Sequence, residues 1–481
     1  MKRILFSLLL CLAYSADAQQ TQIDGLGTLS FPNSGTEQAQ DAFLRGVLLM
    51  HSFEYGPSVT FFRDARTEDP SFALAYWGEA MTYNHPIWNQ RDLEAGRAVL
   101  HQLGATPAVR RAKAGTTREK MYLDAVEMLY GDGSKEEQDL AYMDAMARLH
   151  EAYPDDDEAT TFYALSILGS KAGERDFAMY MRAAAIAQPV FVGNPDHPGA
   201  AHYLIHSFDD PIHAPLGMLA ANAYSDIAPD AAHAQHMTSH IFVAMGLWDR
   251  VVQANVRASG VQDTERSGRG MGPNTCGHYS SWLHYGYLML GEYQEAESLM
   301  DACHASVAAD EGSLFYFTIM RARHVMDTQD WTMSSRWTTD LNREAGNRTG
   351  EGIFGGAPFT YHLTNAFAAL MQGDSQSAEQ ILSEDWGEHP GRLIQLDQLR
   401  GLLLTRTGRV DHGLALIKSA ADAEAELPFE FGPPSIVKLG YELLGEALAG
   451  AGRDSSGAYR EASARTPGRP LSMAAARPGS N

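Results

Sequence analysis

Histidines are concentrated in one part of this 481-residue chain. Seven of the 18 histidines fall within residues 197–240, and they are His197, His202, His206, His213, His233, His236 and His240. Neutral imidazole is a common ligand of zinc, copper and iron, and it also donates and accepts hydrogen bonds. The concentration therefore predicts a site that binds a metal ion or another ligand.

The spacing of these histidines places them on shared helix faces. His202 and His206 are four residues apart, so on a helix they lie one turn above each other. The same pair recurs thirty-four positions later as His236 and His240, and His233 lies on the face of that second pair. Packed helix axes are about 8–10 Å apart, so imidazoles on two neighbouring helices can meet.

Short turns between Ala-rich helical segments repeat along the chain. The turns carry glycine followed by an aromatic or acidic residue, as in Gly246-Leu-Trp248, Gly291-Glu-Tyr293, Gly373-Asp374 and Gly452-Arg453-Asp454. This pattern resembles the tetratricopeptide repeat (TPR) family, whose unit is a helix–turn–helix of about 34 residues. The resemblance implies an all-α, right-handed superhelical solenoid of about ten to fourteen antiparallel helix pairs, in which first helices line a concave groove.

The resemblance divides the chain into segments. We expect a signal peptide at 1–18, N-terminal repeats at 36–100, central repeats with the histidine groove at 119–260, further repeats at 274–340 and 357–465, and a disordered tail at 466–481. Arg257–Pro273, with four glycines, is interpreted as an exposed loop.

The turn glycines fix equivalent positions in successive repeats. His233, His236 and His240 lie thirteen, ten and six residues before Gly246, and His278, Ser281 and Tyr285 lie at the same distances before Gly291. In TPR proteins these positions face the groove, so the resemblance implies one trough lined by His202, His206, His233, His236, His240 and His278. Helical angles alone show only that each set is one-sided. Further groove-lining candidates are His51, His85, Ser281, Tyr285, Glu442 and Glu446.

Three interpretations of the trough compete. The first is a transition-metal site for zinc, copper or iron, with His202, His206, His233, His236 and His240 as ligands and Asp209 or Asp210 nearby. The second is ligand binding without metal, to a peptide, protein or small molecule. The third is a scaffold for protein assembly whose histidines only pack. We favour a groove that binds its ligand through a metal, with a metal-dependent hydrolase or oxidoreductase as the alternative.

No catalytic residue can be assigned from the sequence. His236 and His240 have the spacing of the zinc-hydrolase motif HExxH, but Met237 stands where the general base would be. That difference weakens a metalloprotease interpretation.

Composition and the N-terminal sequence indicate which partners are disfavoured and where the protein is located. A net charge of −23 disfavours nucleic acid as a partner. Lys2 and Arg3 precede an apolar run that ends in Ala16-Asp17-Ala18, which is typical of a secretory signal and too short for a stable membrane span. We therefore expect export to the periplasm or the extracellular space. There Cys276 and Cys303, near the start of one expected helix and the end of the next, form a disulfide or stay as two buried thiols.

Overall fold

The computed structural model describes residues 20–171, 176–307, 311–339, 341 and 356–475. In this part of the chain 23 α-helices and one short 3-10 helix account for nearly all regular structure, and the only strands form two short antiparallel hairpins. The predicted all-α solenoid is confirmed. The expected signal peptide at 1–18 lies outside the described residues.

The N-terminal half contains the two hairpins and the first nine helices. The strands are β1 (Thr21–Ile23), β2 (Gly27–Leu29), β3 (Asn84–His85) and β4 (Gln90–Arg91). The helices are α1 (Glu37–His51), α2 (Tyr55–Glu68), α3 (Ala73–Met81), α4 (Leu93–Leu103), α5 (Pro107–Lys113), α6 (Thr117–Leu129), α7 (Lys135–Ala152), α8 (Asp157–Gly169) and α9 (Phe177–Gly193).

The central and C-terminal helices continue the array. They are α10 (Pro198–Phe208), α11 (Ala214–Ile227), α12 (Ala232–Ala244), α13 (Trp248–Gly268), α14 (His278–Leu290), α15 (Tyr293–Ser306), α16 (Glu311–Thr328), the 3-10 helix η1 (Trp331–Ser335), α17 (Ala357–Met371), α18 (Gln376–Ser383), α19 (Pro390–Arg406), α20 (Val410–Ala425), α21 (Gly440–Gly450), α22 (Ser456–Arg465) and α23 (Pro470–Ala475).

Local sequence signals set the ends of these helices. Capping boxes start α6 at Thr116 and α7 at Ser134, and the side chain of Asp156 caps α8. The turn glycines Gly246 and Gly291 adopt φ angles of 67° and 76°, the left-handed region that glycine enters without steric cost. These residues reverse the chain, so each first helix is followed by an antiparallel second helix.

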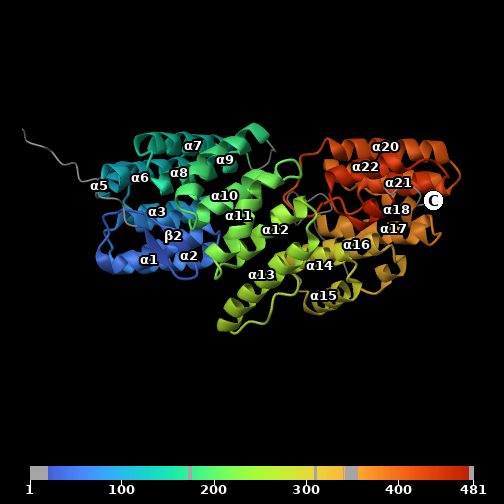
Figure 1. Ribbon diagram of the computed structural model, residues 1–481, viewed down its shortest axis with the longest axis horizontal. Coiled ribbons are helices and arrows are strands. Elements are labelled where there is room, and N and C mark those ends of the chain that lie inside the picture. The colour runs from blue at the N-terminus through green and yellow to red at the C-terminus, as the bar shows by residue number, and fades with distance from the viewer. Residues whose placement is uncertain (1–19, 172–175, 308–310, 340, 342–355, 476–481) are drawn as a thin grey trace, which may run out of the picture.

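The pairs stack so that first helices lie beside first helices. In the centre, α10 packs against both α8 and α12, while α11 and α13 are the second helices of their pairs. Figure 1 shows the molecule elongated, with the N-terminal helices at one end, α17 to α22 at the other, and α10, α12 and α14 between them. The core follows this division, with one large apolar cluster from Ile23 to Ala296 and another from Ile319 to Ala458.

Two segments differ from the sequence-based expectation. Arg257–Pro273 is not a loop throughout, because α13 continues to Gly268 and so crosses the expected boundary at residue 260. The chain from Thr466 does not begin a disordered tail, since α23 follows and Arg469 is buried. The guanidinium of Arg469 donates to Glu442 at 2.9 Å and to Asp327 at 2.5 Å, which ties the C-terminal segment to α21 and α16. Residues 476–481 lie outside the described residues.

Candidate metal centre

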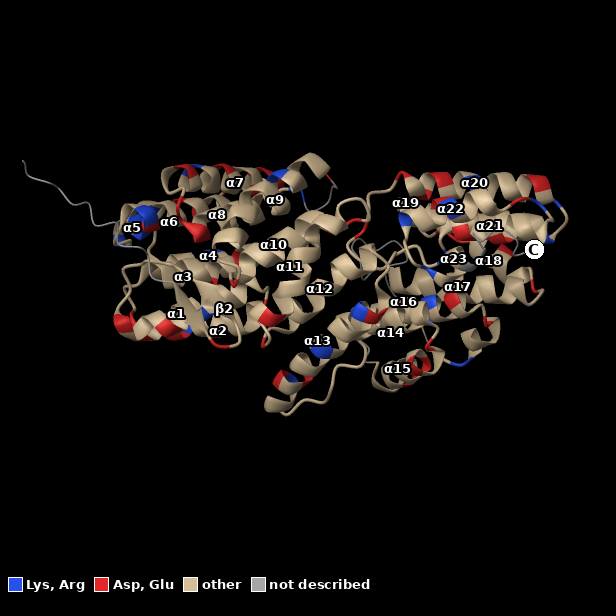
Figure 2. Ribbon diagram, in the orientation of Figure 1, with Lys and Arg blue, Asp and Glu red and all other residues tan. Residues whose placement is uncertain are grey.

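The central helices provide a setting with few charges. Figure 2 shows α10 and α12 free of Lys, Arg, Asp and Glu, and α11 almost so. Every residue of α10 and α12 is buried, including all five histidines that the two helices carry. A buried imidazole is more stable neutral, with a lone pair on one ring nitrogen. The repeat therefore brings neutral nitrogen donors together inside the protein.

Two groups of three histidines form where α10, α12 and α14 meet. Cluster A consists of His202 and His206 of α10 with His233 of α12, and cluster B consists of His236 and His240 of α12 with His278 of α14. Within each cluster, one ring nitrogen from each histidine lies within 4.8 Å of the other two. The structure thus brings together the five histidines predicted as ligands, and adds His278.

Cluster B has three Nε2 atoms at short distances. The Nε2 atom of His236 lies 3.1 Å from Nε2 of His240 and 2.9 Å from Nε2 of His278. Nitrogen ligands at about 2.0–2.1 Å from a tetrahedral zinc ion are about 3.4 Å apart, so the three atoms need to move little to share one ion.

The tautomers of two of these histidines follow from their neighbours. Nδ1–H of His236 donates to the side-chain oxygen of Asn255 at 2.7 Å, and Asn255 is itself oriented by a bond from its amide nitrogen to the Val251 carbonyl. Nδ1–H of His240 donates to the carboxylate of Asp209 at 2.6 Å. In both neutral rings the lone pair is therefore on Nε2. Such support of the second ring nitrogen is typical of histidines that bind metal.

The lone pairs of His236 and His240 face each other at 3.1 Å and repel unless a cation or a proton lies between them. One proton on His278 could satisfy only one of them. Burial lowers the pKa of His236 well below its ordinary value, and it lowers the pKa of His278 to about 3, with further lowering from neighbouring histidines. Protonation of His236 or His278 at neutral pH is therefore unfavourable, and a metal cation can accept the facing lone pairs.

In cluster A, two nitrogen atoms lack a partner. Nδ1–H of His202 donates to the main-chain oxygen of His51 at 2.7 Å, so its Nε2 carries the lone pair. Among the described residues, neither Nε2 of His202 nor Nε2 of His233 has a hydrogen-bond partner, although both atoms are buried. A buried polar atom without a partner costs about 1–3 kcal/mol of stability. Burial also lowers the pKa of His202 to about 3.

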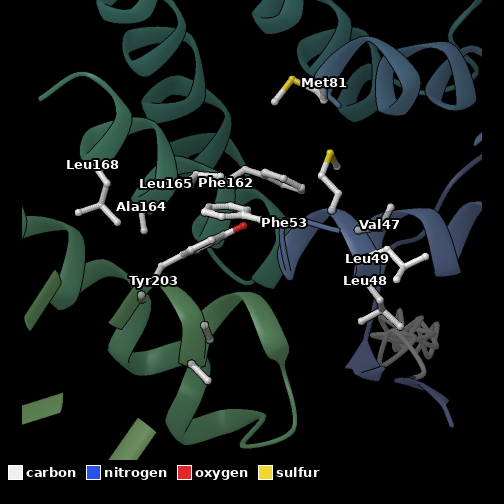
Figure 3. Close-up of a cluster of buried hydrophobic side chains, with 14 of the residues drawn as sticks. Val47, Leu48, Leu49, Phe53, Met81, Phe162, Ala164, Leu165, Leu168 and Tyr203 are labelled. Atoms are coloured by element: carbon white, nitrogen blue, oxygen red, sulfur yellow. The ribbon is translucent and has the colours of Figure 1, made fainter. Parts of the chain in front are cut away.

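An aromatic wall from the N-terminal repeats covers cluster A. The ring centroid of Phe53 lies 4.3 Å from that of His202 and 5.5 Å from that of His233, and Trp88 lies 5.7 Å from His233. Phe53 has a φ of 54°, an uncommon conformation for a bulky residue. Figure 3 shows Phe53 together with Tyr203 of α10 in the surrounding apolar core, and their centroids are 6.2 Å apart.

A cleft of about 770 Å³ is lined by one histidine of each cluster. Its lining includes His233 of cluster A and His278 of cluster B, together with Phe53, Glu54, Trp88, Arg266, Tyr279 and Tyr316. The carboxylate of Glu54 accepts a hydrogen bond from the main-chain N–H of His233 at 2.8 Å. Burial raises the pKa of Glu54 to about 7. On the opposite side, Trp282 packs against His240, with ring centroids 4.4 Å apart.

The disulfide helps to hold His278. Cys276 and Cys303 are bonded, with a Cα–Cα distance of 4.5 Å, and Cys276 lies two residues before His278. The bond attaches the start of α14 to α15, so it limits the movement of one ligand of cluster B.

The remaining groove candidates serve other contacts. His85 in β3 stacks on Tyr55, with centroids 4.1 Å apart, and the Ser281 hydroxyl donates to the His278 carbonyl at 2.8 Å. The Tyr285 hydroxyl accepts from Arg469 at 2.7 Å. None of these three residues belongs to cluster A or cluster B.

The two candidate glutamates are likewise engaged in ion pairs. Burial alone would raise the pKa of Glu442, but Arg469 outweighs it and the pKa is lowered to about 2. Glu446 pairs with Lys438 at 2.5 Å. Neither carboxylate belongs to a histidine cluster.

His51 forms a third group, with Glu158 and His197. Nε2–H of His51 donates to Glu158 at 2.7 Å, and Nε2–H of His197 donates to the same carboxylate at 3.2 Å. The Tyr203 hydroxyl lies 2.8 Å from Nδ1 of His51, and the main-chain N–H of Ala200 donates to Nδ1 of His197. Every ring nitrogen has a protein partner, so this group is stable without a metal.

Several residues around the clusters had no signal in the sequence. Asn255 comes from α13, a second helix, and Phe53 and Glu54 come from the turn between α1 and α2. Their roles depend on packing between segments far apart in the chain. Asp209 and Asp210 were both marked in advance by their position after His206, and of the two only Asp209 bonds to a histidine of a cluster.

Comparison with known proteins places the chain in no established family. No model of a protein family matches the sequence, and no curated protein matches it. Among solved structures, it is similar to the crystal structure of yeast Tom70, with 12% identity, 91% of this chain and 95% of that chain covered and a TM-score of 0.33. It is also similar to the TPR domain of P58(IPK), with 9% identity, 91% and 96% covered and a TM-score of 0.21.

Proposed function

We propose that this helical-repeat protein binds a transition metal at His236, His240 and His278, and that the metal in turn binds a ligand that enters through the cleft. The observation that carries the proposal is the short separation of three Nε2 atoms. In two of the neutral rings the lone pair lies on Nε2, because Nδ1–H donates to Asn255 or to Asp209. Zinc, copper and iron all accept imidazole ligands.

The number of protein ligands leaves room for a further ligand. Three histidines are the protein ligands of many zinc sites that keep one coordination position open. The side chain of His278 is only partly buried and lines the cleft, so a ligand in the cleft can reach the metal. Tyr279, Tyr316 and Arg266 on the same lining offer stacking, hydrogen bonding and a positive charge to that ligand.

Metal content of the untagged protein tests the proposal. The purified protein is expected to retain metal in near-stoichiometric amount, and His236→Ala combined with His240→Ala is expected to remove the metal of cluster B. His213→Ala is the matched control, because His213 lies in the same histidine-rich stretch but bonds to Asp210 outside both clusters. Equal metal in the double variant and in the control would refute the assignment.

An enzyme using the same metal is the second candidate. It is favoured by the carboxyl group of Glu54, which lines the same cleft as His278 and can serve as a base beside a metal-bound water. Hydrolysis of activated phosphate and carboxylate esters, measured for the metal-loaded protein and for Glu54→Gln, tests this candidate. The variant should retain its metal and lose turnover. Turnover that is equal in both proteins would refute the role of Glu54.

Export is part of the proposal. The disulfide between Cys276 and Cys303 supports an oxidising compartment, where such bonds persist. Mass spectrometry of the protein isolated from its own cells should show a chain that begins at Gln19. An intact N-terminus in a cytoplasmic fraction would refute export. We also expect no binding to nucleic acid, which the net charge of −23 disfavours.

A further inference from the structure

The two histidine clusters are copies of one motif. Cluster B takes an i, i+4 pair from α12 and its third histidine from the first turn of α14. Cluster A takes the equivalent pair from α10, one repeat earlier, and its third histidine from the first turn of α12. His233 and His278 each lie thirteen residues before a turn glycine, at Gly246 and Gly291. The same three positions of the repeat therefore supply both clusters.

From this duplication we infer that cluster A holds a second metal ion, so that the protein carries a dinuclear centre with each ion bound by three histidines. The inference rests on the proposed function, because it adds a second ion beside the one assigned to cluster B. Repeat symmetry alone would only place the side chains. The lone pairs of cluster A supply the independent argument.

Two ring nitrogens of cluster A, on His202 and His233, are buried without a hydrogen-bond partner among the described residues. The bond from His202 to the His51 carbonyl forces the lone pair onto Nε2, and this atom has no hydrogen-bond partner among the residues that the structure describes. Nε2 of His233 likewise has no hydrogen-bond partner among the described residues. Both residues belong to cluster A, in which one ring nitrogen of each histidine lies within 4.8 Å of the other two, so a cation in the cluster can be shared by both residues.

The group of His51, His197 and Glu158 differs from cluster A because all its ring nitrogens have protein partners. In the group of His51, His197 and Glu158, the proton of each imidazole goes to the carboxylate, and the remaining nitrogens have donors facing them. That group needs no cation. Its role is to hold His51, whose carbonyl in turn orients His202. The Glu158 group therefore positions a ligand of cluster A and does not form a third metal site.

The clusters are neighbours across α12. The ring centroid of His233 lies 5.9 Å from that of His236, and the centroid of His206 lies 6.0 Å from that of His240. Since His233 and His278 line the same cleft, a ligand bound there lies beside one histidine of each cluster. A small anion with two oxygen or nitrogen donors fits such a pair, because each ion has only three protein ligands and the histidines leave both charges uncompensated.

Metal stoichiometry tests the inference. Titration of the apo-protein with Co²⁺, followed by absorbance and native mass spectrometry, should saturate at two equivalents. His202→Ala with His206→Ala should reduce this to one, as should His236→Ala with His240→Ala, while His213→Ala should keep two. Circular dichroism of each variant shows whether the helices persist.

A measurement on the unmodified protein covers the case in which a variant does not fold. With Cu²⁺, two neighbouring ions should give an electron paramagnetic resonance spectrum broadened or weakened by coupling between the ions, and added azide should change both sites together. A saturation at one equivalent, with an uncoupled spectrum, would overturn the second ion. If that single ion were retained in the His202 variant and lost in the His236 variant, the proposed function would stand alone. Failure to bind any metal would overturn both.

Discussion

The carboxylate of Asp209 controls the ligand state of His240, and its replacement gives the sharpest test of cluster B. Asp209 is only 2% exposed, and its oxygen lies 2.6 Å from Nδ1 of His240. In Asp209→Asn the negative charge is lost, and an amide that presents its NH₂ group would move the ring proton to Nε2. Either change weakens His240 as a ligand.

The expected magnitude follows from the loss of this support. Removal of an outer partner of a metal-binding histidine typically lowers metal affinity about 10–100-fold, which corresponds to about 1.4–2.7 kcal/mol. We expect the lower part of this range if the amide oxygen still accepts from Nδ1–H. We expect the upper part if the amide turns and Nε2 becomes protonated.

The chain offers a closely matched control in the next residue. Asp210 is 1% exposed and accepts from Nδ1–H of His213 at 2.9 Å, outside both clusters. Asp210→Asn therefore removes a buried charge and a histidine partner at the same helix end, and we expect its metal affinity to be unchanged. Competition with a chromophoric chelator for Zn²⁺, at fixed pH, gives the dissociation constants of the wild-type, Asp209→Asn and Asp210→Asn apo-proteins. Unchanged affinity in Asp209→Asn, or an equal loss in both variants, would refute the role assigned to Asp209.

Three further predictions concern the groups around the centre. Cys276→Ser should lower the free energy of unfolding by about 3.5 kcal/mol, the chain-entropy value for a closed loop of about 27 residues, and should weaken Zn²⁺ binding through His278. Cys303→Ser should lower the free energy of unfolding by the same amount in denaturant titrations. A difference between the two variants would show that the loss does not come from the disulfide. Burial lowers the pKa of His202 to about 3, so below pH 6.5 the unfolded chain takes up a proton that the folded apo-protein does not. Relative to His202→Gln, wild-type apo-protein should therefore lose about 1.4 kcal/mol per pH unit as the pH falls from about 6.5 towards about 3, and parallel pH profiles of the two proteins would contradict this. Arg469→Met leaves Glu442 and Asp327 buried without their common partner, so we expect a loss of about 3–5 kcal/mol in guanidinium unfolding, and a loss under about 1 kcal/mol would show that the C-terminal segment contributes little.

The clustering of the histidines could be predicted because a repeat preserves side-chain direction. Once the turn glycine Gly246 was recognised, the interval of one repeat placed His202 and His236 at equivalent points of successive first helices. The offset of thirteen residues linked His233 with His278 in the same way, although the distance between those two repeats is longer. Helix geometry and a constant turn therefore give the equivalence of these positions, and the resemblance to TPR proteins implied that they face one groove.

The supporting residues could not be predicted, because they depend on how distant helices pack. Asn255 reaches His236 from α13, and the carbonyl of His51 reaches His202 from the end of α1. The tail was misjudged for a related reason. Arg469 has buried acidic partners on α16 and α21, and nothing near it in the sequence indicates these partners.

The repeat also explains why the motif stops where it does. In the repeat after cluster B, Ser281 and Tyr285 take the places of the i, i+4 pair, and their hydroxyl groups bond to His278 and Arg469. In the repeat before cluster A, the position equivalent to His233 is Gly199, and a Cβ atom there would lie 2.3 Å from Nδ1 of His51. A histidine at that position would displace the ring that links Glu158 to the His51 carbonyl and so to His202. The motif therefore ends after cluster B at Ser281 and Tyr285, whose hydroxyl groups have other partners. It ends before cluster A at Gly199, which leaves room for His51, the residue that orients His202.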